Sequence, residues 1–252
     1  MLSADRNKVT KLLGASPIYN RGGFTGSEIQ RTGNLFVGES INNIYAYKFQ
    51  KIAQASDTAK LSGINFGGRT VHPGDIVPED RDGNKIINDA DRYVVGKTDP
   101  NFYGGFGSDV TYKGIGLTVF FNYSSGLKRL SYLYEAGVSS TGMSVASTDM
   151  LNRWTPEHTN TNIPRAVYGI SRFGYGDVDL GVQNASFLRM SVLSLSYTIP
   201  ASVRHKMFLD NARIYITGSN LLLFTKDKGF DPETGDSFPN TKTISCGLNL
   251  SL

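Results

Sequence analysis

Cysteine is almost absent from this sequence, since Cys246 is the single cysteine among 252 residues. One cysteine excludes a disulfide within the chain and any zinc site built from several thiolates. The residues around Cys246 alternate between apolar and polar, and they put the thiol on the apolar side of a predicted strand. We therefore expect a buried, unreactive thiol at this position.

Long apolar runs are also missing. No stretch approaches 18 consecutive apolar residues and the mean hydropathy is −0.24, which excludes a protein built from membrane-spanning helices. The first residues, Met1 to Arg6, contain no apolar core of signal-peptide length. If the protein lives outside the cytoplasm, we expect its export signal to lie upstream of this sequence.

Charge does not gather in long blocks, and the residue patterns of enzymes are missing. Lysines and arginines are scattered and the formal net charge is +4, so we expect no nucleic-acid partner. His72, His158 and His205 fall in three separate connections, which argues against a histidine metal site or catalytic base. There is no G-x-S-x-G segment, and paired carboxylates occur only in loops. We expect no catalytic residues, no organic cofactor and no enzymatic activity.

Two long alternating segments occupy the middle of the chain. Residues 102–112 and 115–124 read as strands, joined by a tight turn at Lys113 and Gly114. In the second strand, one side carries Ile115, Leu117, Val119, Phe121 and Tyr123, and most of the other carries Gly116, Thr118, Asn122 and Ser124. A strand of about ten residues with one apolar and one largely polar side is what a tilted membrane-spanning β-strand requires. Within the first strand, Gly104-Gly105-Phe106-Gly107 predicts close packing or a kink.

Further strands are predicted on both sides of this pair. Residues 186–199 form one whose apolar phase slips, and a β-bulge near Val192 would restore the phase. Residues 213–224 form another, whose inward and outward sides the sequence leaves undecided. The last strand, residues 243–252, alternates cleanly, with Cys246 on its apolar side. Residues 2–13 suggest a strand end or a short helix, and residues 35–52 contain a strand.

The connections alternate between short and long. The turn at Lys113 and Gly114 is tight, and residues 200–211 form a short, helical turn, whereas residues 53–97, 126–184 and 226–241 form long connections. Residues 126–184 are expected to be largely irregular, with one helix near residues 144–153. Long loops at one end of the strands and short turns at the other are typical of an outer-membrane barrel, in which the long loops are external. We therefore predict an all-β protein made of antiparallel strands of a transmembrane β-barrel.

An acidic segment inside the first long connection is a candidate calcium site. Oxygen donors recur at alternate positions, and the candidate ligands are Asp80, Asp82, Asn84, the backbone carbonyl of Ile86, Asn88 and Asp91. The spacing is that of an EF-hand loop, but Lys85 stands where such a loop has glycine, and Asp91 replaces its final glutamate. The alternative is a turn in which Asp and Asn side chains bind their own backbone.

Aromatic residues supply two further hypotheses. Tyr132, Tyr134, Trp154 and Tyr168 lie in the long connection of residues 126–184 and are candidates for contact with a substrate or a partner protein. The alternative is packing inside a folded loop. Tyr45, Tyr47, Tyr112 and Tyr123 lie near strand ends, as the aromatic girdle of a membrane protein does.

At several segments the chain resembles the SusC/RagA-type TonB-dependent outer-membrane receptors. The segments, in chain order, are Gly74-Asp75-Ile76 and the acidic loop, Val95-Gly96-Lys97-Thr98-Asp99-Pro100-Asn101-Phe102-Tyr103-Gly104-Gly105-Phe106-Gly107, Arg153-Trp154-Thr155-Pro156-Glu157, Ile163-Pro164-Arg165-Ala166, Phe187-Leu188-Arg189, Leu195-Ser196-Tyr197-Thr198-Ile199-Pro200, Gly218-Ser219-Asn220-Leu221, Gly229-Phe230-Asp231-Pro232-Glu233 and Gly247-Leu248-Asn249-Leu250. They follow the order and spacing of the family and extend from about Asn7 to the end of the chain.

The resemblance implies a plugged barrel of about 22 strands, of which this chain holds about the last six. Residues 1–252 would form a C-terminal segment of the barrel without the plug domain or the signal peptide. The implied function is TonB-dependent import of large nutrients, oligosaccharides or peptides, across the bacterial outer membrane. The implied partners are a SusD-type surface lipoprotein, the TonB complex acting through the plug, and membrane lipid. One departure is Leu252, because such chains commonly end in an aromatic residue.

The sequence also permits a second class of function. A soluble or surface-attached β-rich module that binds carbohydrate would have a similar composition. The order of the family segments and the sorting of the connections by length favour the receptor.

Overall fold

The chain divides into two compact units in a computed structural model that describes residues 1–14, 16–22, 28–139, 146–168, 173–204, 206 and 208–251. The strand unit contains residues 1–5, 100–126 and 185–252. The loop unit contains residues 6–99 and 127–184. His205 and Leu252, which the sequence analysis singled out, lie outside the described residues.

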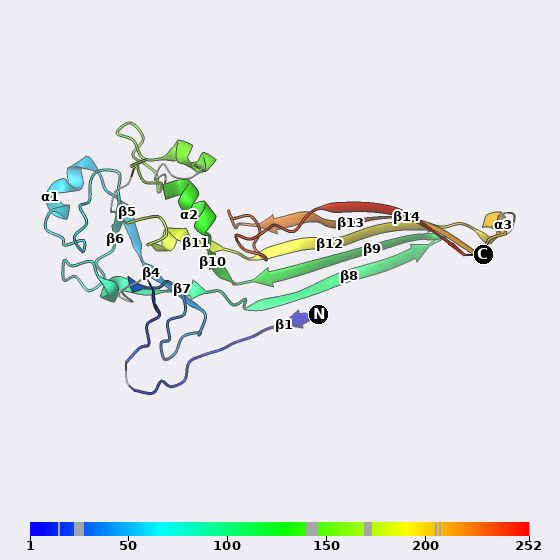
Figure 1. The fold of residues 1–252 in the computed structure, drawn as a ribbon, viewed down its shortest axis with the longest axis horizontal. Helices are drawn as coiled ribbons and strands as arrows, with labels where there is room; N and C mark the ends of the chain where they lie inside the picture. Colours follow the sequence, from blue (N-terminus) through cyan, green and yellow to red (C-terminus); the bar gives the residue numbers. More distant parts are fainter. Residues whose placement is uncertain are drawn as a thin grey trace. The chain divides into compact units, whose positions relative to one another are not determined.

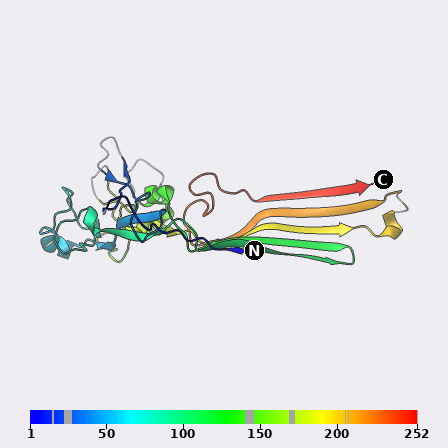
Figure 2. The ribbon, with the colours of Figure 1, turned by 90° about the horizontal axis from the view of Figure 1, so that it is seen from below.

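The strand unit is an antiparallel sheet of six strands. Their order in the sheet is β1 (Leu2–Ser3), β8 (Phe102–Tyr112), β9 (Ile115–Ser125), β12 (Phe187–Thr198), β13 (Asn211–Thr225) and β14 (Thr243–Ser251), as Figures 1 and 2 show. Each of the long strands pairs with its neighbour in the sequence, so the long strands form an up-and-down meander. The predicted strands are confirmed from residue 102 onward. The first strand of the sheet is contributed by Leu2–Ser3, and residues 35–52 do not belong to it.

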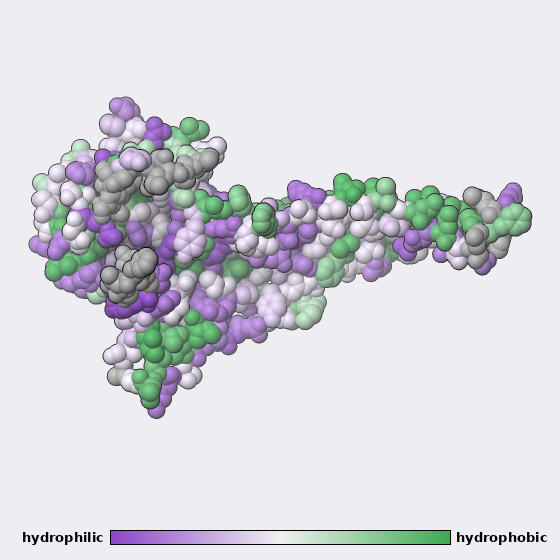
Figure 3. Space-filling model, in the orientation of Figure 1, coloured by the Kyte–Doolittle hydropathy of each residue, from purple (hydrophilic) through white to green (hydrophobic). Residues whose placement is uncertain are grey.

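The register gives this sheet two chemically different faces. Directly paired residues share a face, so the pairs Val110–Leu117, Leu117–Leu195, Leu195–Ile216 and Ile216–Cys246 form one apolar row across five strands. The neighbouring row, on the opposite face, contains Asp109, Thr118, Ser194, Thr217 and Ser245. Many large side chains of the apolar face are exposed in this unit, including Leu195 at 48% and Leu248 at 56%. Figure 3 shows green, hydrophobic patches over these strands among white and purple ones.

Cys246 lies on the apolar face, as predicted, but its side chain is exposed and not buried. Leu195, on the same face of the inner strand β12, is also 48% exposed, so exposure belongs to the whole apolar face and not to the position of β14 in the sheet order.

A β-bulge in β12 keeps the apolar face continuous. On β9 the pairing steps from Phe121 to Phe120, while on β12 it steps from Met190 to Val192, which leaves Ser191 as the extra residue. Even-numbered residues before the bulge and odd-numbered residues after it therefore share one face. This is the bulge that the phase slip predicted. The neighbouring ladder to β13 shifts at the same place.

The undecided phase of β13 is settled by its pairing. Leu222 lies opposite Met190 and Phe224 opposite Leu188, which puts both on the apolar face with Ile214 and Ile216. The sequence could not decide this because residues 221–224 are four consecutive apolar residues, which carry no alternation.

The short connections have the predicted local structures. Lys113 and Gly114, between β8 and β9, both have positive φ angles, 47° and 84°, as a tight hairpin turn requires. The connection between β12 and β13 contains helix α3 (Ala201–Arg204) directly after Pro200. Because the strands are antiparallel, the long connections 6–99, 126–184 and 226–241 all leave from the opposite end of the sheet. The described part of the chain has no helix that is long and apolar enough to cross a membrane.

The glycine-rich part of β8 leaves room for a neighbouring aromatic ring. A side chain built on Gly105 or Gly107 would come within 2.7 Å of the ring of Phe120, which β9 contributes. Phe120 thus packs over the backbone of β8, on the face that is otherwise largely polar. This is the close packing that the sequence predicted for this segment.

The loop unit is built from short elements. Its strands are β2 (Arg21–Gly22), β3 (Glu28–Ile29), β4 (Asn43–Tyr47), β5 (Phe49–Ile52), β6 (Ile76–Pro78), β7 (Arg92–Lys97), β10 (Lys128–Leu130) and β11 (Val182–Asn184), and its α-helices are α1 (Thr58–Leu61) and α2 (Tyr132–Ser139). The strands pair two by two, as β2–β3, β4–β7, β5–β6 and β10–β11. A shared hydrophobic core, which includes Ile76, Val77, Val138 and Val178, joins β4, β5, β6, α1 and α2.

One prediction for this region is wrong, and another is confirmed in part. Tyr45 and Tyr47 lie in β4, where both are 6% exposed, so neither belongs to an aromatic girdle at the strand ends of the sheet. The helix expected near residues 144–153 is present as the 3-10 helix Thr148–Asn152, and residues 144 and 145 lie outside the described part. Within the described residues of this connection, the α-helix is α2, which ends at Ser139. Tyr112 and Tyr123 do lie near the ends of β8 and β9.

Candidate functional site

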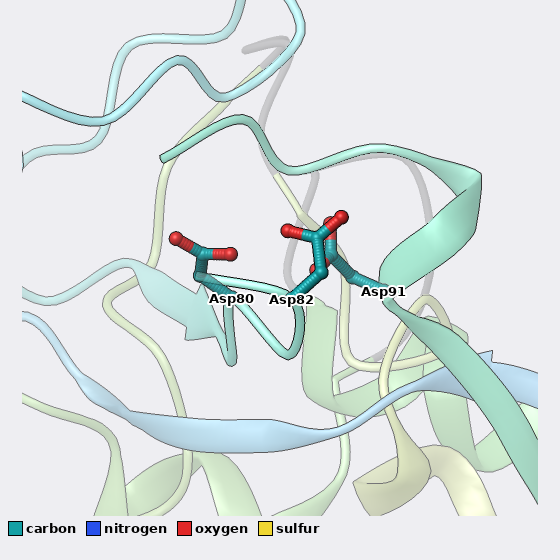
Figure 4. Close-up of side chains that lie close together, drawn as sticks. All are labelled: Asp80, Asp82 and Asp91. Carbon is teal, nitrogen blue, oxygen red and sulfur yellow. The ribbon is translucent and has the colours of Figure 1, made fainter. Parts of the chain in front are cut away.

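The acidic loop of the loop unit brings three carboxylates together. It connects β6 to β7, and oxygen atoms of Asp80, Asp82 and Asp91 all lie within 4.8 Å of one another (Figure 4). Asp91 is fully buried, whereas Asp82 is exposed. Clustered carboxylate oxygens are the donors that a hard cation such as calcium prefers.

Backbone amides hold these carboxylates in place. Asp80 accepts hydrogen bonds from the amides of Gly83 and Lys85, both at 2.8 Å, and Asp82 accepts one from Asn84 at 3.0 Å. Asp91 accepts from the amides of Arg81 at 2.8 Å and Asn88 at 2.9 Å. The Asx-turn geometry of the alternative hypothesis is therefore present. Each carboxylate oxygen has a second lone pair, so the turn also orients the cluster for a cation.

The other predicted ligands serve the turn. The side-chain oxygen of Asn84 accepts from the amide of Ile86 at 2.7 Å, and that of Asn88 accepts from the amide of Ala90 at 2.8 Å. The amide group of Asn88 donates to the carbonyl of Ile86 at 3.4 Å. These side chains flank the carboxylate cluster and close the loop around it.

Lys85 has a backbone conformation that suits glycine. Its φ angle is +62°, in the left-handed region that costs a non-glycine residue free energy. An EF-hand loop has glycine at this position for its sharp turn. The chain therefore makes the same turn with a lysine in the place of glycine.

The four candidate aromatic residues do not form one site. Tyr134 is 7% exposed, donates to Asp149 at 2.6 Å and packs edge-on against Tyr175. Burial, followed by this hydrogen bond, raises the pKa of Tyr134 far above its ordinary value. Its role is packing, which was the alternative hypothesis. Tyr168, in contrast, is 74% exposed.

Trp154 belongs to a structural cluster that unites two of the recognised sequence motifs. Its indole nitrogen donates to Gln54 at 3.1 Å, and a side chain built on Gly74 would overlap its ring. The neighbouring Asp75 is 1% exposed and binds the guanidinium of Arg165 through two hydrogen bonds, at 2.8 and 3.2 Å. These contacts hold the Gly74-Asp75 motif against residues 154–165, although the two segments are distant in the sequence.

Tyr132 lines a polar pocket of about 420 Å³ in the loop unit. The lining residues are Gln30, Arg31, Thr32, Tyr47, Gly67, Arg69, Ile87, Asn88, Asp89, Arg92, Tyr132 and Asp177. Sequence reasoning found Tyr132 and Asn88 but missed the three arginines. They come from three separate segments and carry no motif, so no signal in the sequence could have joined them.

The wall of this pocket is braced by a long-range ion pair. Arg31 donates to both carboxylate oxygens of Glu135 in α2, at 2.5 and 2.9 Å, and to the carbonyl of Gly176 at 2.5 Å. Burial lowers the pKa of Arg31, but the Glu135 carboxylate outweighs burial, and the pKa lies above its ordinary value. Arg31 is therefore a permanent cation that fixes α2 against the segment of residues 30–32.

The strand unit has its own buried ion pair. Arg189 of β12 donates to Asp231 at 2.6 Å, and these side chains are 3% and 2% exposed. Two further recognised motifs, at residues 187–189 and 229–233, meet here. Burial raises the pKa of the Asp231 carboxyl, but the hydrogen bonds that it accepts outweigh burial and hold its pKa below the ordinary value. The other donors are the amides of Glu233 at 2.9 Å and Asn240 at 3.2 Å.

Known proteins similar to this chain are receptors and transporters. No protein-family model matches the chain. It is 33% identical over 271 residues to the TonB-dependent receptor P3 of Formosa agariphila, an alignment that covers 98% of this chain and 26% of the relative. It is 26% identical to the TonB-dependent receptor SusC of Bacteroides thetaiotaomicron, covering 98% of this chain and 23% of the relative.

Solved structures of transporters have a similar fold. A structure described as the RagAB peptide transporter superposes with a TM-score of 0.70 at 24% identity, covering 99% of this chain and 26% of that chain. The chain thus spans about a quarter of the length of the proteins that it matches.

Proposed function

The chain belongs to the SusC/RagA-type TonB-dependent receptors, and we propose that it supplies barrel wall and external loops to an outer-membrane importer of large nutrients. The nutrient is an oligosaccharide or a peptide. The residues form the C-terminal segment of the barrel. Function is transport and not catalysis, in agreement with relatives that are named receptors and transporters.

The observation that carries this proposal is the two-faced sheet. Its long strands contain 9 to 15 residues, and a membrane-spanning strand needs about 9–11. The apolar rows across β8, β9, β12, β13 and β14 then face lipid, which satisfies side chains that a soluble protein would have to cover. Exposed apolar rows of this extent are a liability for a soluble binding module, the alternative function.

The opposite face supplies the polar interior of the barrel. Thr118 donates to Asp109 at 2.5 Å, the hydroxyls of Ser194 and Thr217 lie 2.8 Å apart, and Arg213 donates to Ser196 at 2.8 Å. These polar pairs link adjacent strands on a face that meets water or the plug in such a barrel.

The sheet requires further strands to close. Among the described residues β14 pairs with β13 alone, and open sheet edges do not occur in the hydrocarbon region of a membrane. A barrel of about 22 strands, the size that the family implies, provides the missing neighbours. The alignment covers 26% of the relative, so most of that relative lies outside it, which supports this view.

Two partners follow from the family. One is a SusD-type surface lipoprotein over the external loops, and the other is the TonB complex, which acts through the plug. The support is a relative named SusC and a structural neighbour described as the RagAB transporter. The loop unit is then external, and Tyr132 and Tyr168, both exposed, are its candidate contacts with nutrient or lipoprotein.

The acidic loop binds calcium in this proposal. The support is the convergence of three carboxylates and the glycine-like turn at Lys85. Bound calcium would fix the connection between β6 and β7 and would supply no chemistry.

Fractionation of the source bacterium tests the function directly. Outer and soluble fractions are separated by gel, and peptides of this chain are located by mass spectrometry. Peptides in an outer-membrane band of about four times the 27.5 kDa of this chain support the importer, because the chain covers 26% of its relative. A 27.5 kDa band in the soluble fraction would instead support the carbohydrate-binding module.

A further inference from the structure

Three arginine side chains surround the pocket of the loop unit, and each lies over an aromatic ring. The guanidinium carbon of Arg31 is 5.2 Å from the ring centre of Tyr132, that of Arg69 is 4.6 Å from Phe173, and that of Arg92 is 4.7 Å from Tyr47. Stacking holds a guanidinium plane in place while its N–H groups stay available at the edge. Of these three guanidinium groups, that of Arg31 already donates to Glu135 and to the carbonyl of Gly176.

These three cations differ in their partners. Arg31 is bound to Glu135, and Arg92 lies 3.2 Å from a carboxylate oxygen of Asp89. Arg69 has no ion pair and no side-chain hydrogen bond among the described residues. Its planar fork of N–H donors matches two oxygens of a carboxylate, so an incoming oxyanion finds its partner there.

The backbone at Arg69 forms a turn, and the guanidinium lies over the ring of Phe173. Arg69 follows Gly67 and Gly68, whose φ angles are +64° and +79°, and its amide donates back to Phe66 at 3.3 Å. Phe66 and Phe173 are 4% and 2% exposed and contact each other edge-on. Binding would thus immobilise few side-chain rotamers at this cation, which favours affinity.

The rest of the lining suits a sugar ring. Tyr132 is 63% exposed and offers an apolar ring surface, and Gln30 and Asn88 offer exposed amide groups. The carboxylate of Asp177 is held by the amide of Gly174 at 2.6 Å. Amides and carboxylates pair with hydroxyl groups, and an aromatic ring packs against the apolar side of a pyranose. A volume of about 420 Å³ is within the ordinary range of small-molecule sites.

The backbone beside the pocket is already engaged. In β4, the amide of Tyr45 donates to the carbonyl of Arg31 at 2.7 Å, and the amide of Tyr47 donates to the carbonyl of Asp177 at 3.1 Å. A peptide that binds by strand addition needs free amides at a strand edge. These two amides of the described chain are therefore not open to a peptide main chain, which excludes strand addition at these two positions.

We infer that this pocket binds an acidic sugar residue of the nutrient, with the sugar carboxylate on Arg69 and the sugar ring against Tyr132. The inference rests on the proposed function and narrows its substrate class to acidic oligosaccharides. The loop unit then selects the cargo by charge before the barrel admits it.

Calorimetry on the intact receptor, purified in detergent, tests this inference. The probes are trimers of galacturonate, glucuronate and mannuronate, each paired with the neutral trimer of the same linkage. At least one uronate trimer is expected to bind more tightly than its neutral counterpart. Replacement R69Q should lower that affinity by about 10- to 100-fold, because a hydrogen bond to a charged group contributes about 1.5–3 kcal/mol.

Matched variants separate binding from folding. R69K keeps the positive charge without the planar set of donors, so its affinity for the uronate trimer should lie between those of wild type and R69Q. Y132A should lower the affinity for acidic and neutral trimers alike. R6Q removes an exposed arginine outside the pocket and should change nothing. All variants are compared at equal thermal stability.

Three results would overturn the inference. One is that no uronate trimer binds more tightly than its neutral counterpart, and another is that R69Q binds as wild type does. The third is that an acidic peptide binds in an Arg69-dependent way and no uronate does. If the receptor is found in the outer membrane while any of these holds, the pocket assignment fails and the importer stands. A soluble 27.5 kDa protein would end the importer proposal first.

Discussion

Arg189 and Asp231 form an ion pair of 2.6 Å in which the side chains are 3% and 2% exposed. Arg189 lies in β12, and Asp231 lies 42 residues later in the connection between β13 and β14. The pair therefore fixes the long connection between β13 and β14 to strand β12 of the sheet.

Replacing Asp231 by asparagine leaves the buried guanidinium of Arg189 without its main counter-charge. We expect D231N to lower the free energy of unfolding by about 3–5 kcal/mol, the usual cost of breaking a buried pair. Urea unfolding of the receptor in detergent, followed by tryptophan fluorescence and gel mobility, measures the change. Glu233 lies 3.2 Å from Arg189 but is 45% exposed, so E233Q should cost far less. Equal losses in the two variants would contradict this account.

Acid should release the same anchor. The pKa of Asp231 is lowered in the folded chain, so its contribution is fully present above the ordinary carboxyl pKa of about 3.9 and is lost as pH falls through the folded value. Wild type should therefore lose stability below about pH 4 more steeply than D231N. Asp57 and Asp99 also have lowered pKa values, and they contribute equally to both proteins. Parallel stability curves of the two proteins in acid would count against the pair.

Neighbouring residues of β12 should respond oppositely to a new charge. Leu195 lies on the apolar face and Ser194 on the polar face. If the apolar face meets lipid, L195R should cost roughly 2–4 kcal/mol near the membrane midplane, and S194R should cost much less. Folded receptor in outer membranes and its urea stability in lipid vesicles are the readouts. A larger loss of stability for S194R than for L195R would contradict the assignment of the apolar face to lipid.

The acidic loop should lose its cation when two of its carboxylates are removed. We expect saturable calcium binding by the intact receptor that D80A combined with D82A weakens by at least about tenfold, since carboxylate count tunes affinity in such loops. Isothermal titration with calcium after treatment with a chelator measures it. Asp210 is exposed and far from the loop in sequence, so D210A serves as control. Unchanged affinity in the double variant would leave the loop as a turn held by its own amides.

Two glycines with similar backbone angles should differ sharply in their tolerance of alanine. Gly74 and Gly14 have φ angles of +88° and +98°, but a side chain on Gly74 would overlap Trp154 and Arg165, while nothing lies within 4 Å of one on Gly14. G14A should cost about 1 kcal/mol for its backbone, and G74A should cost about 1–3 kcal/mol more for overlap. Protease sensitivity of the loop unit and thermal unfolding are suitable measurements. Similar losses would mean that backbone angle alone matters at Gly74.

The sheet could be predicted from sequence because its signal is local. Alternation within each of β8, β9 and β14 identifies both the strand and its two faces, and the phase slip in β12 identifies the bulge. The same rule fails at residues 221–224 of β13, where consecutive apolar residues erase the alternation.

The loop unit could not be predicted in this way, because its order depends on distant partners. Arg31 and Glu135, which hold α2, are 104 residues apart. Tyr45 and Tyr47 alternate as in a half-exposed strand, yet all five residues of β4 are buried, because other segments cover both sides. The carboxylates of the acidic loop were identifiable since they lie within 12 consecutive residues, whereas the arginines of the pocket were not.

The single extra residue of β12 also dictates how this strand can evolve. We expect even-numbered positions before Ser191, and odd-numbered positions after it, to accept apolar replacements, because these positions share the apolar face. Accepted substitutions along β12 should therefore alternate between apolar and polar, and the phase of this alternation should shift by one residue at Ser191. Loss of Ser191 by a three-base deletion would do more than shorten the strand, because it would turn one half of it inside out relative to its neighbours.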